Sequence, residues 1–187
     1  MNKYKKLAFN SGLFTVANFG SRLMNFLFMP FYTYWLTTSQ LGTADTMVLT
    51  VNLFAPLVTL SLQDAVLRYV MTKNADVQKI LSCALICPIF TSLLSGICSY
   101  FIFQQLPVFR DYWFLFFLLL ILQSFNTIFL QFSRGIGRLK VFALNGVINT
   151  AAQIVSNFLF LGALHLDISG YLLALIVAYL VANLHLV

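Results

Sequence analysis

The sequence contains very little charge, since Asp, Glu, Lys and Arg make up only 9% of its 187 residues and glutamate is absent. A water-soluble domain carries charged side chains at about a quarter of its positions. Hydrophobic residues instead make up 60% of this chain, and phenylalanine alone occurs 20 times. A soluble globular domain is therefore excluded, and we expect most of the chain to lie in lipid.

Groups that could carry catalysis or bind a metal are also scarce. The three cysteines, Cys83, Cys87 and Cys98, fall in one apolar segment. Cys83 and Cys87 are one helical turn apart, which is not the spacing of a redox pair, and three cysteines in one segment are too few for a zinc site. The sequence has no Ser–His–Asp set, no glycine-rich phosphate loop and no paired carboxylates within one helix. We therefore predict no enzyme activity, no metal and no cofactor.

The apolar residues form six segments, each long enough for a helix to cross a hydrocarbon core of about 30 Å. They cover residues 7–36, 46–70, 80–103, 112–132, 141–164 and 168–186. The short alternating segments of a membrane β-barrel are not seen. Helices satisfy every backbone polar group in lipid, so the predicted fold is an all-α polytopic membrane protein with six transmembrane helices.

Basic residues gather on one side of these helices. Nine lie in the N-terminal segment or flank the second and fourth connections: Lys3, Lys5, Lys6, Arg68, Lys73, Lys79, Arg134, Arg138 and Lys140. The other connections contain only Arg110. Cytoplasmic loops carry the excess of Lys and Arg in membrane proteins, so both termini are predicted to be cytoplasmic. The net charge of +6 thus reflects topology and does not call for a nucleic-acid partner.

Four predicted helices carry polar residues at helical spacing. These stripes are Ser11, Thr15, Asn18, Arg22 and Asn25 in the first helix; Thr46, Thr50, Ser61, Asp64 and Arg68 in the second; Gln123, Thr127, Gln131 and Arg134 in the fourth; and Asn145, Asn149, Gln153 and Ser156 in the fifth. Hydrogen bonding between helices accounts for most of them. The third and sixth predicted helices carry fewer polar residues, and we expect them to face lipid or to close the back of the bundle.

Arg22 is the exception among these polar residues, because it lies near the midpoint of its predicted helix. An arginine at that depth cannot reach either interface, and placing it there costs at least about 2.5–3.5 kcal/mol. Asp64 is the only acid predicted within a helix away from a connection, and Arg68 competes for it one turn later. A structural pair for Arg22 stays possible, but a cavity that handles an anion is the favoured interpretation.

Three stretches resemble the polysaccharide-biosynthesis flippases, the Wzx-type transporters of the multidrug/oligosaccharidyl-lipid/polysaccharide exporter superfamily. The first is NFGSRLMNFLFMPFYTYWLTTSQLGTAD, with its S-R pair and its L-G at the start of the second helix. The second is LVTLSLQDAVLRYV, which closes that helix, and the third is QFSRGIGRLKVFALNGVINT, a basic loop that leads into the fifth helix. The three stretches occur in the order and at the helices that this family requires.

The resemblance implies a protein of the bacterial inner membrane that carries oligosaccharide on undecaprenyl diphosphate from the cytoplasmic to the outer leaflet. Arg22 matches an arginine that lines the cationic cavity of the related lipid II flippases. The cavity residues expected on this basis are Arg22, Asn18, Asn25, Asn145 and Asn149. Asp64 and Arg68 are expected to act in a gate or in packing between lobes. Arg134, Arg138 and Lys140 are expected to attract the head group, although topology and lipid contact also account for them.

The family has twelve or more helices in two lobes, whereas six are predicted here. We therefore expect this chain to be an N-terminal lobe whose partner is a second six-helix lobe, from a longer chain or from a dimer. Two alternatives stay open. A cation-coupled multidrug exporter of the same superfamily needs a carboxylate within the membrane, for which Asp64 is the one candidate and lies towards one end. A membrane scaffold or inactive remnant needs no cavity at all.

Overall fold

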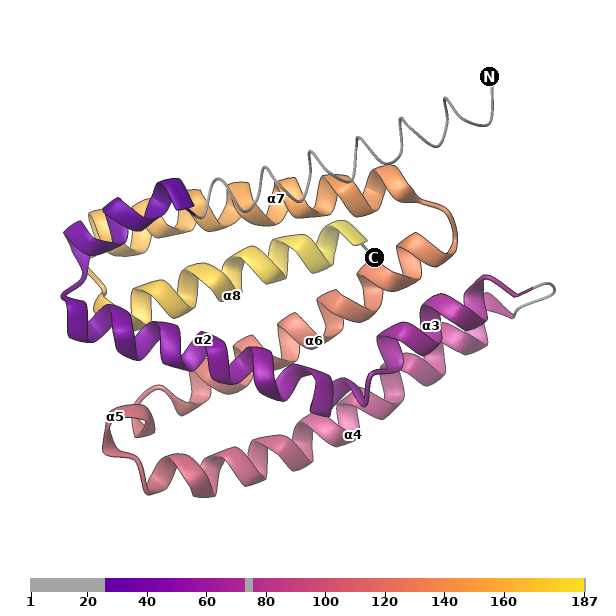
Figure 1. Cartoon of the computed structure of the whole chain (residues 1–187), viewed down its shortest axis with the longest axis horizontal. Coiled ribbons are helices and arrows are strands. Elements are labelled where there is room, and N and C mark those ends of the chain that lie inside the picture. The colour runs from indigo at the N-terminus through magenta and orange to yellow at the C-terminus, as the bar shows by residue number, and fades with distance from the viewer. Residues whose placement is uncertain (1–25, 73–75, 187) are drawn as a thin grey trace.

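The computed structural model describes residues 26–72 and 76–186, and within these ranges it contains helices and no strand. Residues 26–35 are helical. The helices that follow are α2 (Thr38–Thr59), α3 (Leu62–Val70), α4 (Val77–Gln104), α5 (Pro107–Arg110), α6 (Trp113–Gly135), α7 (Leu139–Asn157), the π-helix η1 (Phe158–Ala163) and α8 (Asp167–Leu186) (Figure 1).

Five helical stretches of the described chain are long and apolar enough to span a membrane. They are α2, α4, α6, α8 and the continuous stretch Leu139–Ala163 formed by α7 and η1. The predicted all-α polytopic membrane protein is thereby confirmed. Of the first predicted span, 7–36, residues 7–25 lie outside the described part, and so do the cavity candidates Asn18, Arg22 and Asn25.

The second predicted helix, 46–70, is wrong in its bounds. The helix begins eight residues earlier, because the Thr37 hydroxyl accepts a hydrogen bond from the Gln40 N–H at 3.3 Å and Gln40 Oε1 accepts one from the Thr37 N–H at 2.9 Å. This reciprocal capping box starts α2 at Thr38. A stretch predicted as a connection, residues 37–45, is therefore almost entirely helical.

The same segment is also broken in its middle. Leu60 and Ser61 both have left-handed backbone conformations, with φ of 49° and 54°. Pro56 lies four residues before Leu60 and has no N–H to donate within the helix. The hydroxyl of Thr91, on α4, donates a hydrogen bond to the Val58 carbonyl, which lies next to the break. The chain therefore enters α3 as a separate short helix.

The sixth predicted helix has the right bounds but not the expected place. We expected it to face lipid or to close the back of the bundle, whereas α8 lies between α6, α7 and α2 (Figure 1). Gly170, Ala174, Ala178 and Ala182 are all buried on it and recur every four residues. Side chains this small let neighbouring helices approach closely, and this is the packing that holds helices together in lipid.

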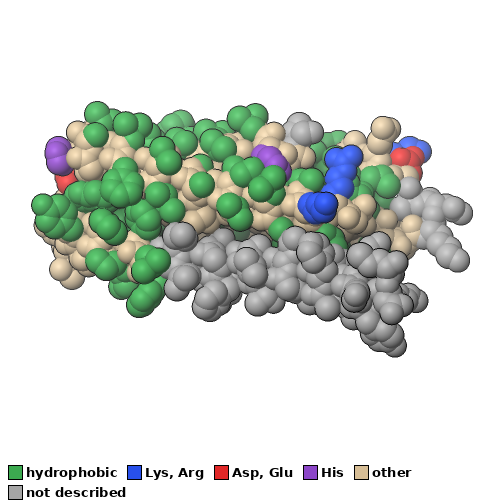
Figure 2. All heavy atoms as spheres, turned by 90° about the horizontal axis from the view of Figure 1, so that it is seen from above, with side chains coloured by type: hydrophobic (Ala, Val, Ile, Leu, Met, Phe, Trp, Pro, Cys, Tyr) green, Lys and Arg blue, Asp and Glu red, His purple; other side chains and the backbone are tan. Residues whose placement is uncertain are grey.

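The third predicted helix, by contrast, turns a broad apolar face outwards. Ile86, Phe90, Leu94, Ile97 and Phe101 on α4 are all exposed. Hydrophobic side chains also cover much of the face shown in Figure 2. In a soluble protein such a surface would cause association. Here it fits a surface that lies against lipid tails.

The interior is divided into two clusters of buried apolar residues. The larger one joins the helical residues 26–35 with α2, α6 and α8, around Met47, Phe116, Leu120 and Leu172. The smaller one joins α3, α4 and α6 through Val66, Val70, Ala84 and Ile128. The break at Leu60 and Ser61 lies on the chain between these two clusters.

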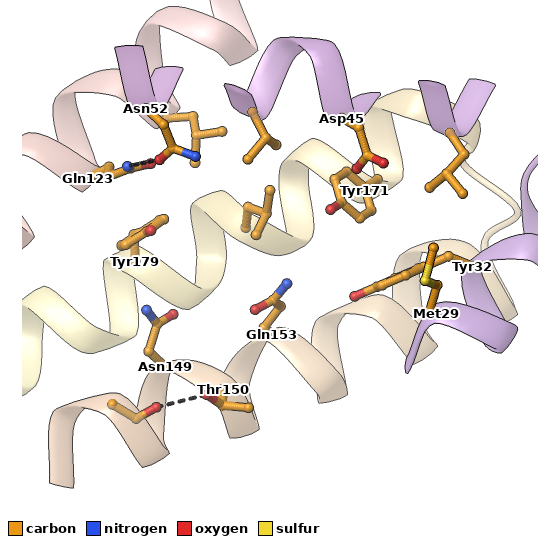
Figure 3. Close-up of a pocket in the computed structure, with 15 residues that line it drawn as sticks. Met29, Tyr32, Asp45, Asn52, Gln123, Asn149, Thr150, Gln153, Tyr171 and Tyr179 are labelled. Carbon is orange, nitrogen blue, oxygen red and sulfur yellow. Dashed lines mark hydrogen bonds between the residues drawn. The ribbon is translucent and has the colours of Figure 1, made fainter. Parts of the chain in front are cut away.

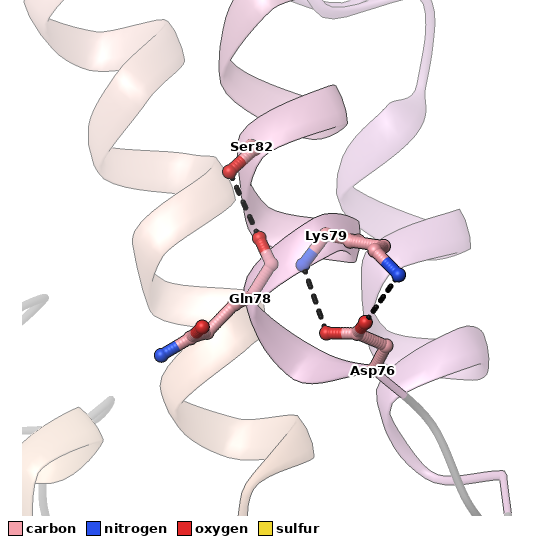
Figure 4. A network of polar contacts seen from close by, with 4 residues as sticks. All are labelled: Asp76, Gln78, Lys79 and Ser82. Atoms are coloured by element: carbon pink, nitrogen blue, oxygen red, sulfur yellow. Dashed lines mark hydrogen bonds and ion pairs between the residues drawn. The ribbon is translucent and has the colours of Figure 1, made fainter.

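The basic residues predicted to be cytoplasmic lie together where the structure describes them. Arg68 is in the last turn of α3, Lys79 is in the first turn of α4, and Arg134, Arg138 and Lys140 surround the connection from α6 to α7. These helix ends meet at one end of the molecule (Figures 1 and 2). At the N-terminus of α4, Asp76 caps the helix and pairs with Lys79 (Figure 4).

Candidate functional site

A polar cavity of about 500 Å³ lies between the helical residues 26–35, α2, α6, α7 and α8 (Figure 3). Its lining consists of Met29, Tyr32, Leu41, Asp45, Val48, Asn52, Leu119, Gln123, Gly146, Asn149, Thr150, Gln153, Tyr171, Leu175 and Tyr179. Small-molecule sites in proteins typically measure about 300–1,000 Å³. The cavity is thus large enough for a ligand of the size of a sugar ring or two.

Helical periodicity explains how each helix contributes to this lining. Asp45, Val48 and Asn52 are spaced by three and four residues along α2 and so share one face. Gly146, Asn149, Thr150 and Gln153 on α7 follow the same rule, and so do Tyr171, Leu175 and Tyr179 on α8. Each of these helices thus turns one face towards the cavity.

One wall of the cavity is closed by an amide pair. Gln123 Nε2 donates a hydrogen bond to Asn52 Oδ1 at 2.6 Å, which joins α6 to α2 (Figure 3). Across the cavity, Asn149 and Gln153 approach from α7, with Tyr179 of α8 beside them (Figure 3). This part of the lining is neutral and offers both donors and acceptors, which is the chemistry that binds hydroxyl groups.

The other part of the lining is built from Asp45 and two buried tyrosines. The rings of Tyr32 and Tyr171 meet edge to face, with centroids 5.2 Å apart and planes at 82°. Tyr32 is held in place by Asn157, whose Nδ2 donates to the Tyr32 hydroxyl at 2.7 Å. Asp45 lies beside Tyr171 and is exposed to the cavity (Figure 3). No described residue forms a hydrogen bond or an ion pair with its carboxylate.

The π-helix η1 begins directly after Asn157, at the edge of this site. Its wider turn follows α7 without interruption and ends at Ala163 before the connection to α8. Such π-helical turns occur frequently at functional sites, because they shift the direction of the side chains around them. Asn157 itself is buried, and its Oδ1 has no hydrogen-bond partner in the described chain.

The predicted site residues fall into three groups. Asn149 lines the cavity, whereas Asn145, one turn earlier, is buried with 1% exposure outside the lining. Asp64 and Arg68 lie exposed on α3, away from the cavity, and form no ion pair with each other in the described structure. Arg134, Arg138 and Lys140 are exposed at the basic end. Asn18, Arg22 and Asn25 lie outside the described residues.

Sequence reasoning missed the carboxylate of the cavity. Asp45 falls within residues 37–45, the stretch predicted as a connection. The signal that identifies it is Thr37 followed by Gln40, the capping box that begins α2 before Asp45. The three tyrosines of the lining were also missed, since a tyrosine within an apolar segment is most often a core residue.

Among the described residues, no three His, Cys, Asp or Glu side chains gather where they could hold a metal ion. The charged lining residue that the structure describes is Asp45 alone. The described part of the site can therefore bind neutral polar groups and attract a cation.

Comparison with known proteins adds nothing to this description, because no family model, no curated protein and no solved structure matches the chain.

Proposed function

We propose that the chain is one lobe of a flippase that moves undecaprenyl-diphosphate-linked oligosaccharide from the cytoplasmic to the outer leaflet of a bacterial inner membrane, by alternating access. The proposal includes cytoplasmic termini and a second six-helix lobe. It follows the resemblance of the sequence to Wzx-type flippases. The observation that carries it is the polar cavity within an otherwise apolar helix bundle.

The lining suits an oligosaccharide head group. Asn52, Gln123, Asn149 and Gln153 supply amides, and three tyrosines supply phenol groups. Amides and phenols both donate and accept, as the hydroxyls of a sugar do. Tyrosine rings also offer apolar faces on which the C–H side of a sugar ring can pack. Simple lipid contact would give no reason to keep so many polar groups at one place in the membrane.

The sequence spacing connects this cavity with the predicted diphosphate site. Met29 and Tyr32, both in the lining, follow Arg22 and Asn25 by seven residues each. In the single helix predicted over residues 7–36, a separation of seven residues returns to nearly the same face. The sequence therefore predicts that Arg22 and Met29 share one helix face. Guanidinium is a planar donor fork that suits a diphosphate.

The test is an export assay in cells whose surface polysaccharide depends on the complete protein. Arg22→Ala and Asn149→Ala should reduce export at unchanged protein amounts, while Gln105→Ala removes an exposed amide outside the cavity and should leave it intact. Asn149→Ala should remove one hydrogen bond to the substrate, worth about 1.4 kcal/mol. Export should therefore fall roughly tenfold in this variant. Normal export by both cavity variants would favour the scaffold or remnant.

A second candidate function, the cation-coupled multidrug exporter, gains support from Asp45. That alternative requires a carboxylate in the cavity, and Asp45 meets the requirement where Asp64 does not. It also predicts aromatic lining, which Tyr32, Tyr171 and Tyr179 provide. Efflux of a cationic dye from cells, abolished by Asp45→Asn, would favour the exporter over the flippase.

A further inference from the structure

The cavity has an uneven distribution of charge. Asp45 is the one charged residue among its described lining, and its carboxylate has no hydrogen-bond or ion-pair partner in the described chain. The remaining polar lining consists of neutral amide, hydroxyl and phenol groups. The carboxylate of Asp45 is exposed towards the cavity, so a cationic ligand group that enters can approach it closely enough for Coulomb attraction. It therefore acts on any ligand group that comes near it.

Aromatic rings stand beside this carboxylate. Tyr32 and Tyr171 are both buried, with 8% of their surface exposed, and they meet edge to face. Asp45 lines the same cavity as both tyrosines and lies beside Tyr171 (Figure 3). The hydroxyls of Tyr171 and Tyr179 have no hydrogen-bond partner in the described structure, so they remain able to bind ligand hydroxyls. A carboxylate next to aromatic rings is the combination that recognises organic ammonium groups.

The architecture keeps this combination in place. Asn157 fixes the Tyr32 hydroxyl from α7, and the capping box at Thr37 fixes the start of α2 two turns before Asp45. Tyr171 is on α8, whose small residues pack it tightly into the bundle. Three different helical segments thus converge on one end of the cavity. A site whose side chains are positioned by rigid elements needs little rearrangement to bind its ligand.

We propose that the end of the cavity formed by Asp45, Tyr32 and Tyr171 binds an ammonium group of the transported substrate and disfavours a carboxylate. The ammonium can come from an amino sugar or from an organic amine without a sugar. The amino-sugar source rests on the proposed flippase function, whereas the ammonium site itself does not. The proposed site does not include Arg22, which lies outside the described residues.

The test uses the purified full chain in lipid nanodiscs and saturation-transfer NMR, which detects weak binding. Glucosamine, N-acetylglucosamine and glucuronate share one ring size and differ in charge, and tetraethylammonium supplies the charge without the sugar. Glucosamine should bind at least tenfold more tightly than the other two sugars. Asp45→Asn should abolish this preference, whereas Asp111→Asn, the same change at an exposed position outside the cavity, should preserve it.

The possible outcomes separate this site from the proposed function. If the three sugars bind equally well, the ammonium site is refuted and a sugar-binding cavity stands. If tetraethylammonium binds through Asp45 and no sugar does, the ammonium site stands and the flippase proposal fails. Binding of none of the four probes refutes the site. If Asp45→Asn fails to fold, the relative affinities of the three sugars decide the question. They are measured on the unmodified chain and on an Asp45→Glu variant, which keeps the charge.

Discussion

Asn157 donates a hydrogen bond from Nδ2 to the hydroxyl of Tyr32 at 2.7 Å, across 125 positions of sequence. Both side chains are buried, so this bond joins the helical residues 26–35 to the end of α7 in the interior of the bundle. It also sets the position of one of the rings that line the cavity. The first described helix is therefore placed by a polar contact as well as by apolar packing.

Tyr32→Phe should lower stability by about 1–2 kcal/mol, because the Asn157 amide loses its partner while it stays buried. The free energy of unfolding can be measured in mixed micelles by titration with a denaturing detergent. Tyr34→Phe is the matched control, since Tyr34 is 85% exposed and its hydroxyl has no hydrogen-bond partner in the described structure. Equal effects of the two variants would show that the buried bond contributes nothing.

Close packing around α8 gives the second prediction. Ala178 has no exposed surface, and it belongs to the small-residue stripe of that helix. Ala178→Leu should therefore force the neighbouring helices apart and cost about 1–3 kcal/mol. Ala151→Leu makes the same change at an exposed position on α7 and should be nearly neutral. Comparable losses of unfolding free energy in both variants would contradict the central place of α8.

The helices themselves were largely predictable from the sequence. Residues 112–132 and 168–186 correspond closely to α6 and α8, because long apolar runs between polar ends leave few other possibilities. The burial of α8 was not predictable from its hydropathy, since lipid tails and a protein interior are equally apolar. Only the size of its side chains distinguishes the two environments, and the signal of burial is Gly170 followed by an alanine at every fourth position.

The site was predictable in part. The polar stripes of the fourth and fifth predicted helices contain Gln123, Asn149 and Gln153, which all line the cavity. Asn145 belongs to the same stripe as Asn149 but is buried away from the lining, because stripe width and the packing of neighbouring helices decide which member faces the cavity. The break after α2 is accompanied by a hydrogen bond from Thr91 on another helix, a contact that no local pattern predicts.

The left-handed conformation at this break gives the third prediction. Ser61 has φ of 54°, a conformation that costs a residue with a side chain more than it costs glycine. Ser61→Gly should accordingly raise stability by about 0.5–1 kcal/mol. Ser82→Gly, within α4, should lower it by about 0.5 kcal/mol, because glycine is a poorer helix former than serine. If both changes lower the free energy of unfolding, the left-handed conformation at Ser61 does not strain the folded chain.

The start of α4 gives a prediction that depends on pH. Asp76 Oδ1 accepts a hydrogen bond from the Lys79 N–H at 3.3 Å, and Oδ2 pairs with Lys79 Nζ at 2.9 Å (Figure 4). The Lys79 side chain, followed by its backbone N–H, holds the pKa of Asp76 below its usual value. A lowered pKa in the folded state means that the stabilisation is present above about pH 4 and is lost as the pH falls through the folded value.

Asp76→Ala should therefore expose the first-turn amides of α4 to faster hydrogen exchange at pH 7, after correction for intrinsic rates. The difference from the unmodified chain should shrink once the pH falls below the folded pKa of Asp76, because a protonated carboxyl caps the helix less well. Asp76→Asn keeps an oxygen acceptor for the Lys79 N–H and should retain most of the protection at both pH values. Asp111→Ala removes an exposed carboxylate elsewhere and should change nothing in α4. Unchanged protection in Asp76→Ala at pH 7 would mean that packing alone, and not the cap, defines where α4 begins.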